Sequence, residues 1–124
     1  MGARLAYAKV IDRQAFYKKG GNLHPKLENG VVLQSEPGAA GAFLVFRGWS
    51  DDHGTFTEQW QIKEPEGRTI YESTPREIHI ASEQHTERLE DEIADLPLEF
   101  AAENYDLVFF LDDREVARVS FPVT

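Results

Sequence analysis

The chain has 124 residues, no cysteine, and 22 acidic against 13 basic residues, which gives a formal net charge of −9. This length predicts a single domain, residues 1–124, with a core of its own. The lack of cysteine excludes disulfides, thiolate catalysis and cysteine-ligated metal sites. The acidic surface repels phosphate groups, so we expect no nucleic-acid partner and no docking on an anionic membrane.

Two further features concern the location of the protein. The longest apolar run, Leu107–Leu111, is far too short to cross a bilayer. No segment near the N-terminus combines the apolar run and the cleavage site of a signal peptide. Together with the absence of cysteine, these features favour a cytoplasmic protein.

Short segments of alternating apolar and polar residues, separated by turn residues, dominate the sequence and predict β-strands. In chain order these segments are Arg4–Ile11, Val31–Gln34, Ala42–Trp49, Thr55–Lys63, Arg68–Glu72, Arg76–Ala81, Leu96–Phe100, Asn104–Leu111 and Glu115–Val123. Seven to nine strands at this spacing predict an all-β, two-sheet antiparallel sandwich.

Two stretches are less clearly extended. The first, Gln14–Lys18, fits either a continuation of the first strand or a helical turn that ends at Gly20-Gly21-Asn22. The second, Ser82–Asp95, is highly charged and has Leu89 and Ile93 at a helical spacing. We expect an exposed connector there, with at most one short helix around residues 84–94.

The strand Thr55–Lys63 alternates cleanly, as a sheet with one solvent-facing side requires. Its apolar face carries Phe56, Trp60 and Ile62, and Glu58 falls on the same face. A carboxylate on that face needs either a local partner or a position at a solvent-facing strand end.

The end of the chain predicts a hairpin. Asn104–Leu111 is apolar on both faces, which indicates a central, covered strand. Asp112-Asp113 is a turn signal, and the strand that follows contains Pro122, a residue confined to edge strands because it cannot donate to a ladder.

Two stretches carry a family resemblance. Trp60–Ile70 has the form of an aromatic strand, a turn with Pro and Gly, and a new apolar strand; Asn104–Ala117 has a tyrosine strand, an acidic turn and Glu-Val-Ala. Over residues 42–124 the chain resembles small bacterial proteins of unknown function with immunoglobulin-like or C2-like sandwiches. In those proteins a Gly usually precedes the tyrosine, whereas Asn104 stands here. The resemblance implies that fold and no catalytic residue.

No motif for catalysis or cofactor binding is present. The histidines are too scattered to form the close pairs typical of zinc sites: His24, His53, His79 and His85. No serine lies in a nucleophile elbow, and no glycine-rich loop is followed by Lys-Ser or Lys-Thr. We therefore expect no cofactor and no enzymatic activity. A small hydrolase with an acidic cleft stays open as a second alternative.

Acidic loops offer one metal hypothesis. Asp51, Asp52 and His53 are adjacent in one predicted turn, and Asp112 and Asp113 form another. Oxygen-rich loops of this kind bind calcium when they meet at one end of a sandwich. Asp is also simply a favoured turn residue, so a divalent-cation module is an alternative function rather than the preferred one.

The preferred hypothesis is a noncatalytic module that binds another protein or pairs with itself through an edge strand. Three aromatic residues are candidate contacts for such a partner. Trp49 follows Gly48 at a strand end and is expected to be half-exposed, Tyr17 adjoins two lysines, and Phe121 lies in the predicted edge strand.

Overall fold

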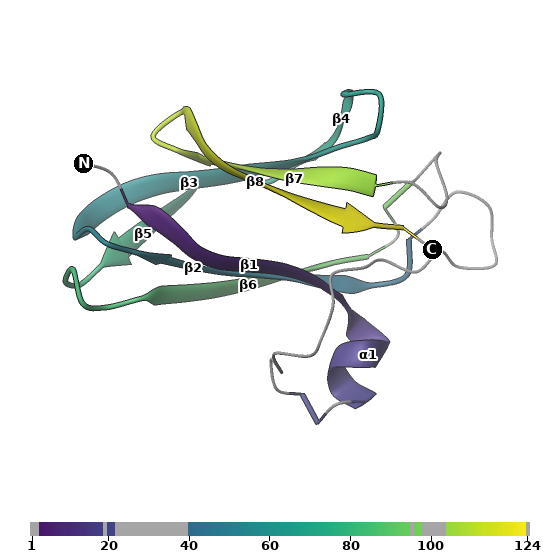
Figure 1. Cartoon of the computed structure of the whole chain (residues 1–124), viewed down its shortest axis with the longest axis horizontal. Coiled ribbons are helices and arrows are strands. Elements are labelled where there is room, and N and C mark those ends of the chain that lie inside the picture. The colour runs from purple at the N-terminus through teal and green to yellow at the C-terminus, as the bar shows by residue number, and fades with distance from the viewer. Residues whose placement is uncertain (1–2, 19, 22–39, 95, 98–103, 124) are drawn as a thin grey trace.

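Two antiparallel β-sheets pack face to face in the computed structural model, and one short helix lies outside the smaller sheet (Figure 1). The structure describes residues 3–18, 20–21, 40–94, 96–97 and 104–123. These residues contain eight strands, within the predicted range. The predicted all-β sandwich is confirmed.

The smaller sheet has the strand order β1-β2-β6. Its strands are β1 (Arg4–Asp12), β2 (Phe43–Ser50) and β6 (Glu87–Ile93). The inner side of β2 carries Phe43 and Val45, as the alternation predicts, and both are buried in the core between the sheets.

The larger sheet is built on β3 (Gly54–Lys63) and β7 (Asn104–Leu111), with β8 (Arg114–Pro122) at its edge. On its other side β3 pairs with two short strands. One half of β3 pairs with β5 (Arg76–Ile80) and the other half with β4 (Thr69–Glu72). The predicted central position of β7 and the edge position of β8 are both confirmed.

The strand order is that of the immunoglobulin fold, in which strands A, B and E share one sheet and C, F and G form the other. Here β1, β2 and β6 take the places of A, B and E, while β3, β7 and β8 take those of C, F and G. In the immunoglobulin constant domain a further strand pairs with E. In this chain β4 and β5 pair with β3 instead, which leaves β6 at the edge of its sheet.

The core fills the space between the two sheets with large side chains from both inner faces. Its largest apolar members are fully inaccessible: Trp49, Trp60, Tyr105, Phe43, Phe109 and Phe121. Trp60 lies on β3, where the immunoglobulin fold places its buried tryptophan. The chain has no disulfide, so the two sheets are held to each other by this apolar packing and by the buried ion pairs described below.

The helix α1 (Arg13–Lys18) is short but capped at both ends. At its start Asp12 accepts a hydrogen bond from the N–H of Ala15 at 3.0 Å, a typical N-cap. At its end Gly20 and Gly21, both with positive φ, donate to carbonyls of the last turn in the pattern of a Schellman motif. The helical alternative for residues 14–18 is therefore correct. Within the described part of the chain, no helix is long and apolar enough to span a membrane.

This helix places a second, smaller apolar cluster on the outside of the β1-β2-β6 sheet. The Phe16 ring packs on Phe46 with ring centroids 4.9 Å apart. Ile11 and Leu44 are buried in the same cluster, and Tyr7 packs against it. The sheet is thus covered by apolar contacts on both faces, at least along β1 and β2.

Some expectations fail or lie outside the described residues. The helix expected around residues 84–94 is wrong, because residues 87–93 form β6. Leu89 and Ile93 share a face in a strand as well as in a helix, and Asp91 between them also points inward, toward a buried arginine. The predicted strand Val31–Gln34 lies outside the described residues, as does most of Leu96–Phe100.

Candidate functional site

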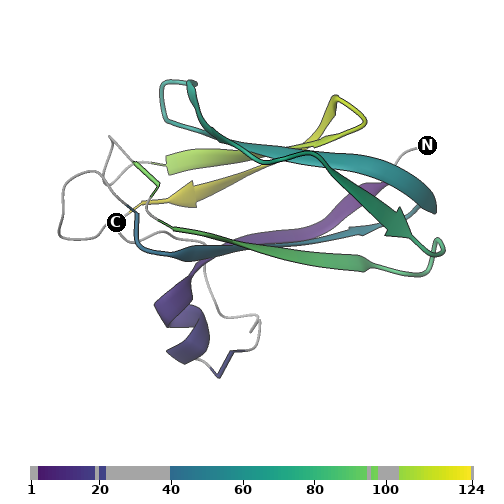
Figure 2. The ribbon, with the colours of Figure 1, turned by 180° about the vertical axis from the view of Figure 1, so that it is seen from behind.

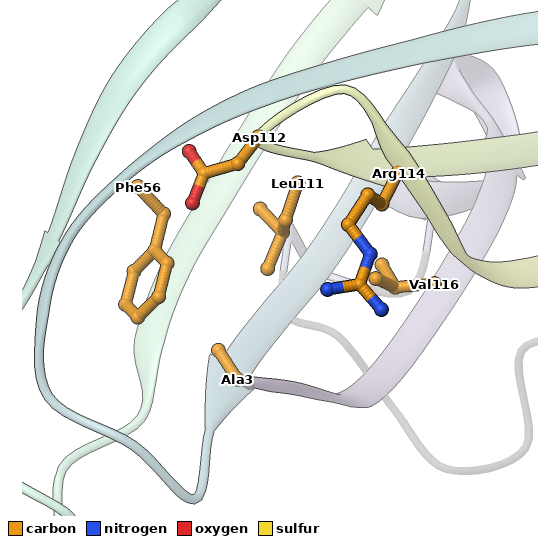
Figure 3. A pocket seen from close by; sticks show the side chains of 6 residues that line it. All are labelled: Ala3, Phe56, Leu111, Asp112, Arg114 and Val116. Carbon is orange, nitrogen blue, oxygen red and sulfur yellow. The ribbon is translucent and has the colours of Figure 1, made fainter. Parts of the chain in front are cut away.

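A groove of about 360 Å³ opens at the end of the sandwich where β1 begins and the β7–β8 turn lies (Figure 3). It is lined by six residues in or beside β1, β3, β7 and β8: Ala3, Phe56, Leu111, Asp112, Arg114 and Val116. Its volume falls within the range of ordinary ligand pockets. Four of the six lining side chains are apolar, so the groove is mainly a hydrophobic surface with two charged residues.

The β7–β8 hairpin sets the direction of the charged and apolar groups on this groove. Arg114 is the cross-strand partner of Leu111, which is buried on the inner side, so the arginine also lies on the inner side of its strand. The pairing of β7 with β8 contains a β-bulge: Phe109 pairs with Ala117 and Phe110 with Glu115, so Val116 between them has no partner on β7. Such a bulge redirects a side chain, and Val116 is 44% exposed beside Arg114 (Figure 3).

The two charged residues of the groove differ in how they are held. Asp112 Oδ1 accepts a hydrogen bond from the Thr57 N–H at 2.9 Å, and the Asp112 N–H donates to the Thr57 carbonyl. Arg114 forms no ion pair with any residue in the described ranges. The groove therefore combines an apolar floor with a guanidinium that is available to a partner.

A second, smaller cleft of about 170 Å³ lies between β6 and the β4–β5 side of the larger sheet. Its lining includes Tyr71 and Thr74 from one side and Asp91 and Ile93 from the other. Figure 2, the view from behind, shows β6 running along this open side of the sandwich below β5. The deepest polar residue in the lining is Glu58, which is 1% exposed.

Glu58 belongs to a buried charge network that joins the two sheets. Arg47 Nη2 lies 2.5 Å from Glu58 Oε1, and Arg47 Nε lies 2.9 Å from Oε2. Trp49 Nε1 also donates to Oε2, at 2.6 Å. Within the described residues, no buried side-chain nitrogen or oxygen atom lacks a hydrogen-bond partner, so this carboxylate is fully compensated.

Asp91 of β6 extends the network toward solvent. Its Oδ2 lies 2.9 Å from Arg47 Nη1, and its Oδ1 accepts a hydrogen bond from Arg76 Nη2 at 2.8 Å. Burial raises the pKa of Asp91, but the Arg47 charge and the two arginine hydrogen bonds outweigh it and lower the pKa below its ordinary value. Burial lowers the pKa of Arg47, and Glu58 and Asp91 outweigh that effect and raise the pKa.

The network contains two arginines and two carboxylates, so it is neutral as a set. Glu58 and Asp91 are both held against Arg47, and the lowered pKa of Asp91 keeps that group ionised at neutral pH. A general acid needs the opposite, a carboxyl whose pKa is raised toward neutrality. The arrangement is suited to holding β2, β3 and β6 together.

The acidic loops lie at the same end of the sandwich, at the left of Figure 1, but Asp51, Asp52 and Asp112 have other partners. Asp51 pairs with Arg4 at 3.4 Å, and Asp52 Oδ1 accepts from the His53 N–H at 2.8 Å. Asp112 is bonded to Thr57, as above. In the part of the chain that the structure describes, no three acidic or histidine side chains are grouped to hold a metal.

Two candidate contacts for a partner are buried. Trp49 is inaccessible, and the expectation of a half-exposed indole is wrong because its side chain points inward with Val45 and Arg47 and donates to Glu58. Phe121 is also buried, against Phe43 and Tyr105. These two aromatic side chains therefore belong to the core.

Tyr17 and the acidic turn residues lie at the surface. Tyr17 is 56% exposed on α1, and the Arg13 guanidinium lies 5.2 Å from the centre of its ring. Asp113 is exposed in the β7–β8 turn. Tyr17 thus remains a candidate contact, although it lies on the helix rather than beside the end groove.

Sequence reasoning missed Arg114 and Val116 of the groove, and it missed the partner of Glu58. A signal existed for the last: Arg47 and Glu58 each interrupt an otherwise apolar strand face, which indicates that two opposite charges meet inside. No comparable signal exists for Val116, because its direction depends on a bulge that the strand pattern does not reveal.

No family model matches the sequence, and no curated protein is recognisably similar to it. Among solved structures, the chain is similar to part of a protein from Bacteroides fragilis described as a "putative beta-galactosidase", with a TM-score of 0.50 and 17% identity. The match covers 73% of this chain but only 15% of that protein. A structure described as an immunoglobulin-like protein, from Pseudomonas aeruginosa, matches with a TM-score of 0.41 and 13% identity, over 100% of this chain and 98% of that one.

At this identity the similarity to the Bacteroides protein concerns the fold alone. It agrees with the β-sandwich seen here, and this chain spans a small share of the length of that protein.

Proposed function

We propose that this chain is a noncatalytic, cytoplasmic binding module whose partner is another protein or a second copy of itself. The observation that supports the proposal is the end groove, which offers apolar surface and an arginine, Arg114, that forms no ion pair with any described residue and lies on the inner side of an edge strand. Immunoglobulin-type sandwiches are scaffolds on which such surfaces are commonly placed. The proposal requires no cofactor.

The position of the groove on β8 favours a macromolecular partner. Arg114 and Val116 both lie on this strand, and its outer edge pairs with no other strand among the described residues. Figure 1 shows β8 and β1 as neighbours on one side of the sandwich, so a partner that contacts β8 would also reach the start of β1. Unpaired backbone groups beside an apolar groove are the elements that β-strand addition uses.

The test compares the wild-type chain with Val116→Asp and Arg114→Glu. We expect either a concentration-dependent dimer in light scattering, or a defined partner recovered from extract and re-bound as the purified protein. In both cases each variant should weaken the complex at least tenfold, because one puts a charge into the apolar surface and the other reverses the available cation.

Thr69→Asp is the matched control, since it adds one negative charge at an exposed position on β4, outside the groove lining. It should leave the complex unchanged. A strict monomer that retains no protein would refute the proposal. A complex that tolerates both groove variants would refute the assignment to this surface.

A further inference from the structure

The outer edge of β6 is the open strand edge beside the lateral cleft. Among the described residues β6 pairs with β2 and with no other strand, in a register that runs without a bulge from Glu87 to Ile93. We propose that this edge binds an extended, basic peptide segment of another protein, which adds as a fourth strand to the β1-β2-β6 sheet. This site is separate from the end groove.

The fold leaves a place for this added strand. In the immunoglobulin constant domain the strand equivalent to β6 has a neighbour on both sides. Here β4 and β5 pair with β3 in the other sheet, so none of the strands that the structure describes takes that neighbour's place. A regular seven-residue strand with no proline and no bulge has the geometry on which backbone hydrogen bonds to a partner strand can form.

The charges on the outer face of β6 select the partner. Three residues are exposed there: Arg88 at the start of the strand, and Glu90 and Glu92 along the rest of it. Glu92 pairs with Arg13 at 3.0 Å, whereas Glu90 has no cationic partner among the described residues. A segment with one cation opposite Glu90, and a second that shares Glu92 with Arg13, would therefore match this face, and the net charge of −9 on the chain would attract it.

A second copy of β6 matches the same face less well. In an antiparallel pair centred on the strand, Glu90 of one copy would lie opposite Glu90 of the other, and in a parallel pair every residue would face its own kind. Like charges directly opposite each other are destabilising. Only Arg88 and Glu92 could pair favourably, in the antiparallel case, and the two chains would each carry a net charge of −9. A basic segment of another protein avoids both repulsions.

The lateral cleft lies directly beside this edge and would accept the inward side chains of the added strand. Its lining includes Asp91 and Ile93 of β6, with Tyr71, Thr74 and Arg76 across the gap. Arg76 is already paired with Asp91 there, so the inward side chain that enters the cleft should be uncharged. A volume of about 170 Å³ is below the range of pockets for small molecules and cofactors, and it suits a single amino-acid side chain. Alternate side chains of a β-strand point to opposite faces, so one inward residue would fill the cleft while its neighbours remain near the outer carboxylates.

The probe is a labelled heptapeptide, Thr-Lys-Val-Lys-Thr-Ser-Thr, added to the full chain and followed by fluorescence anisotropy and amide hydrogen exchange. In an antiparallel arrangement its two lysines face Glu92 and Glu90, its serine faces Arg88, and its valine points toward the cleft. We expect saturable binding and new protection of amides in residues 87–93. The peptide Pro-Lys-Pro-Lys-Pro-Ser-Pro keeps the length and the lysines but cannot form a strand, so it should bind at least tenfold more weakly.

Glu90→Lys should weaken binding of the first peptide at least fivefold, because it reverses the carboxylate that faces one of the two lysines. Glu66→Lys is the matched control: it makes the same change at an exposed residue of the β3–β4 turn and should have little effect. Val116→Asp should also have no effect, so this proposal and the proposal for the end groove can fail separately.

Four outcomes would overturn the inference. Absence of saturable binding would remove the site. Equal binding of the proline peptide would mean that charge alone attracts the probe, without strand addition. Protection outside residues 87–93 would place the peptide elsewhere. Protection of β6 that rises with protein concentration in the absence of peptide would mean that a second copy occupies the edge.

Discussion

Arg47 of β2 and Glu58 of β3 face each other across the interior of the sandwich, and two hydrogen bonds of 2.5 and 2.9 Å join them. The arginine is 0% exposed and the glutamate 1%. A buried pair of this kind gains little over an apolar pair of the same volume, but removing one partner leaves an uncompensated charge inside. The pair therefore adds little net stability, but replacing Arg47 alone should cost much more than replacing both residues.

The Arg47–Glu58 pair predicts strongly non-additive substitutions. Arg47→Met should lower the free energy of unfolding by about 3–5 kcal/mol, because it leaves Glu58 without its opposite charge. Glu58→Gln should cost less, because Arg47 keeps its ion pair with Asp91. The double variant Arg47→Met/Glu58→Gln should cost clearly less than the sum of the two. Urea unfolding of the four proteins measures the coupling. Additive losses would show that the pair contributes only by packing.

The pKa of Asp91 predicts how stability responds to acid. Its pKa in the folded chain is lowered, mainly by Arg47 against the opposing effect of burial, so the folded state binds fewer protons than the unfolded state. The resulting stability is complete above the ordinary aspartate pKa of about 3.9. It should disappear as the pH falls through that value and then through the lower pKa of the folded state.

The variant Asp91→Asn isolates this contribution. It should be less stable than wild type at pH 7, and the difference should narrow in thermal unfolding below about pH 4, where wild-type Asp91 begins to be protonated. Glu66→Gln, at an exposed position, should show no such convergence. A gap between Asp91→Asn and wild type that does not change with pH would contradict the assignment.

Gly48 predicts a steric effect on the outer face of the small sheet. It is the cross-strand partner of Tyr7, and a Cβ added to it would overlap the Tyr7 ring and lie 2.9 Å from Thr86 Cγ2. Gly48→Ala should therefore cost about 1–3 kcal/mol, despite the usual small gain from replacing glycine in a strand. The cost should shrink in a Tyr7→Ala background. An equal cost in both backgrounds would remove the ring as its cause.

The β7–β8 turn predicts a stabilising change. Asp112 and Asp113 have φ values of 50° and 65°, and they connect the paired residues Leu111 and Arg114, so they form a two-residue turn of type I′. Asp113→Gly should raise the free energy of unfolding by roughly 0.5 kcal/mol, because glycine takes positive φ without steric cost. Asp112→Gly should gain less, since it also loses the bond to the Thr57 N–H. A lower melting temperature for Asp113→Gly would refute this explanation.

The sheets could be predicted because their strands have simple patterns. The alternation of Phe56, Trp60 and Ile62 in β3, and the two apolar faces of Asn104–Leu111, follow directly from which side of a strand is covered. Pro122 correctly indicated an edge strand, because its missing N–H excludes a central position. Each of these signals depends only on neighbouring residues in the chain.

The errors arose where a polar residue takes part in the core. Asp91 points inward between Leu89 and Ile93, so counting it as a solvent-facing residue hid the strand pattern of β6. Trp49 was expected to be half-exposed because it stands at the end of its strand, yet Glu58 provides a buried acceptor for its indole. Both arrangements depend on Arg47, and no local pattern specifies which distant carboxylates it will meet.

The Arg47–Glu58 pair also bears on which alignment of strands the chain can adopt during folding. If β2 shifted by one residue against its neighbours, every side chain on it would exchange faces, and Arg47 would move to the outer face, away from Glu58. Glu58 would then be enclosed between the sheets with its charge uncompensated. A misaligned intermediate could still bury apolar side chains, Leu44 and Phe46 in place of Val45 and Trp49, but it could not satisfy that carboxylate. The ion pair thus favours the native register of β2 over a register shifted by one residue, which burial of apolar side chains alone would not exclude.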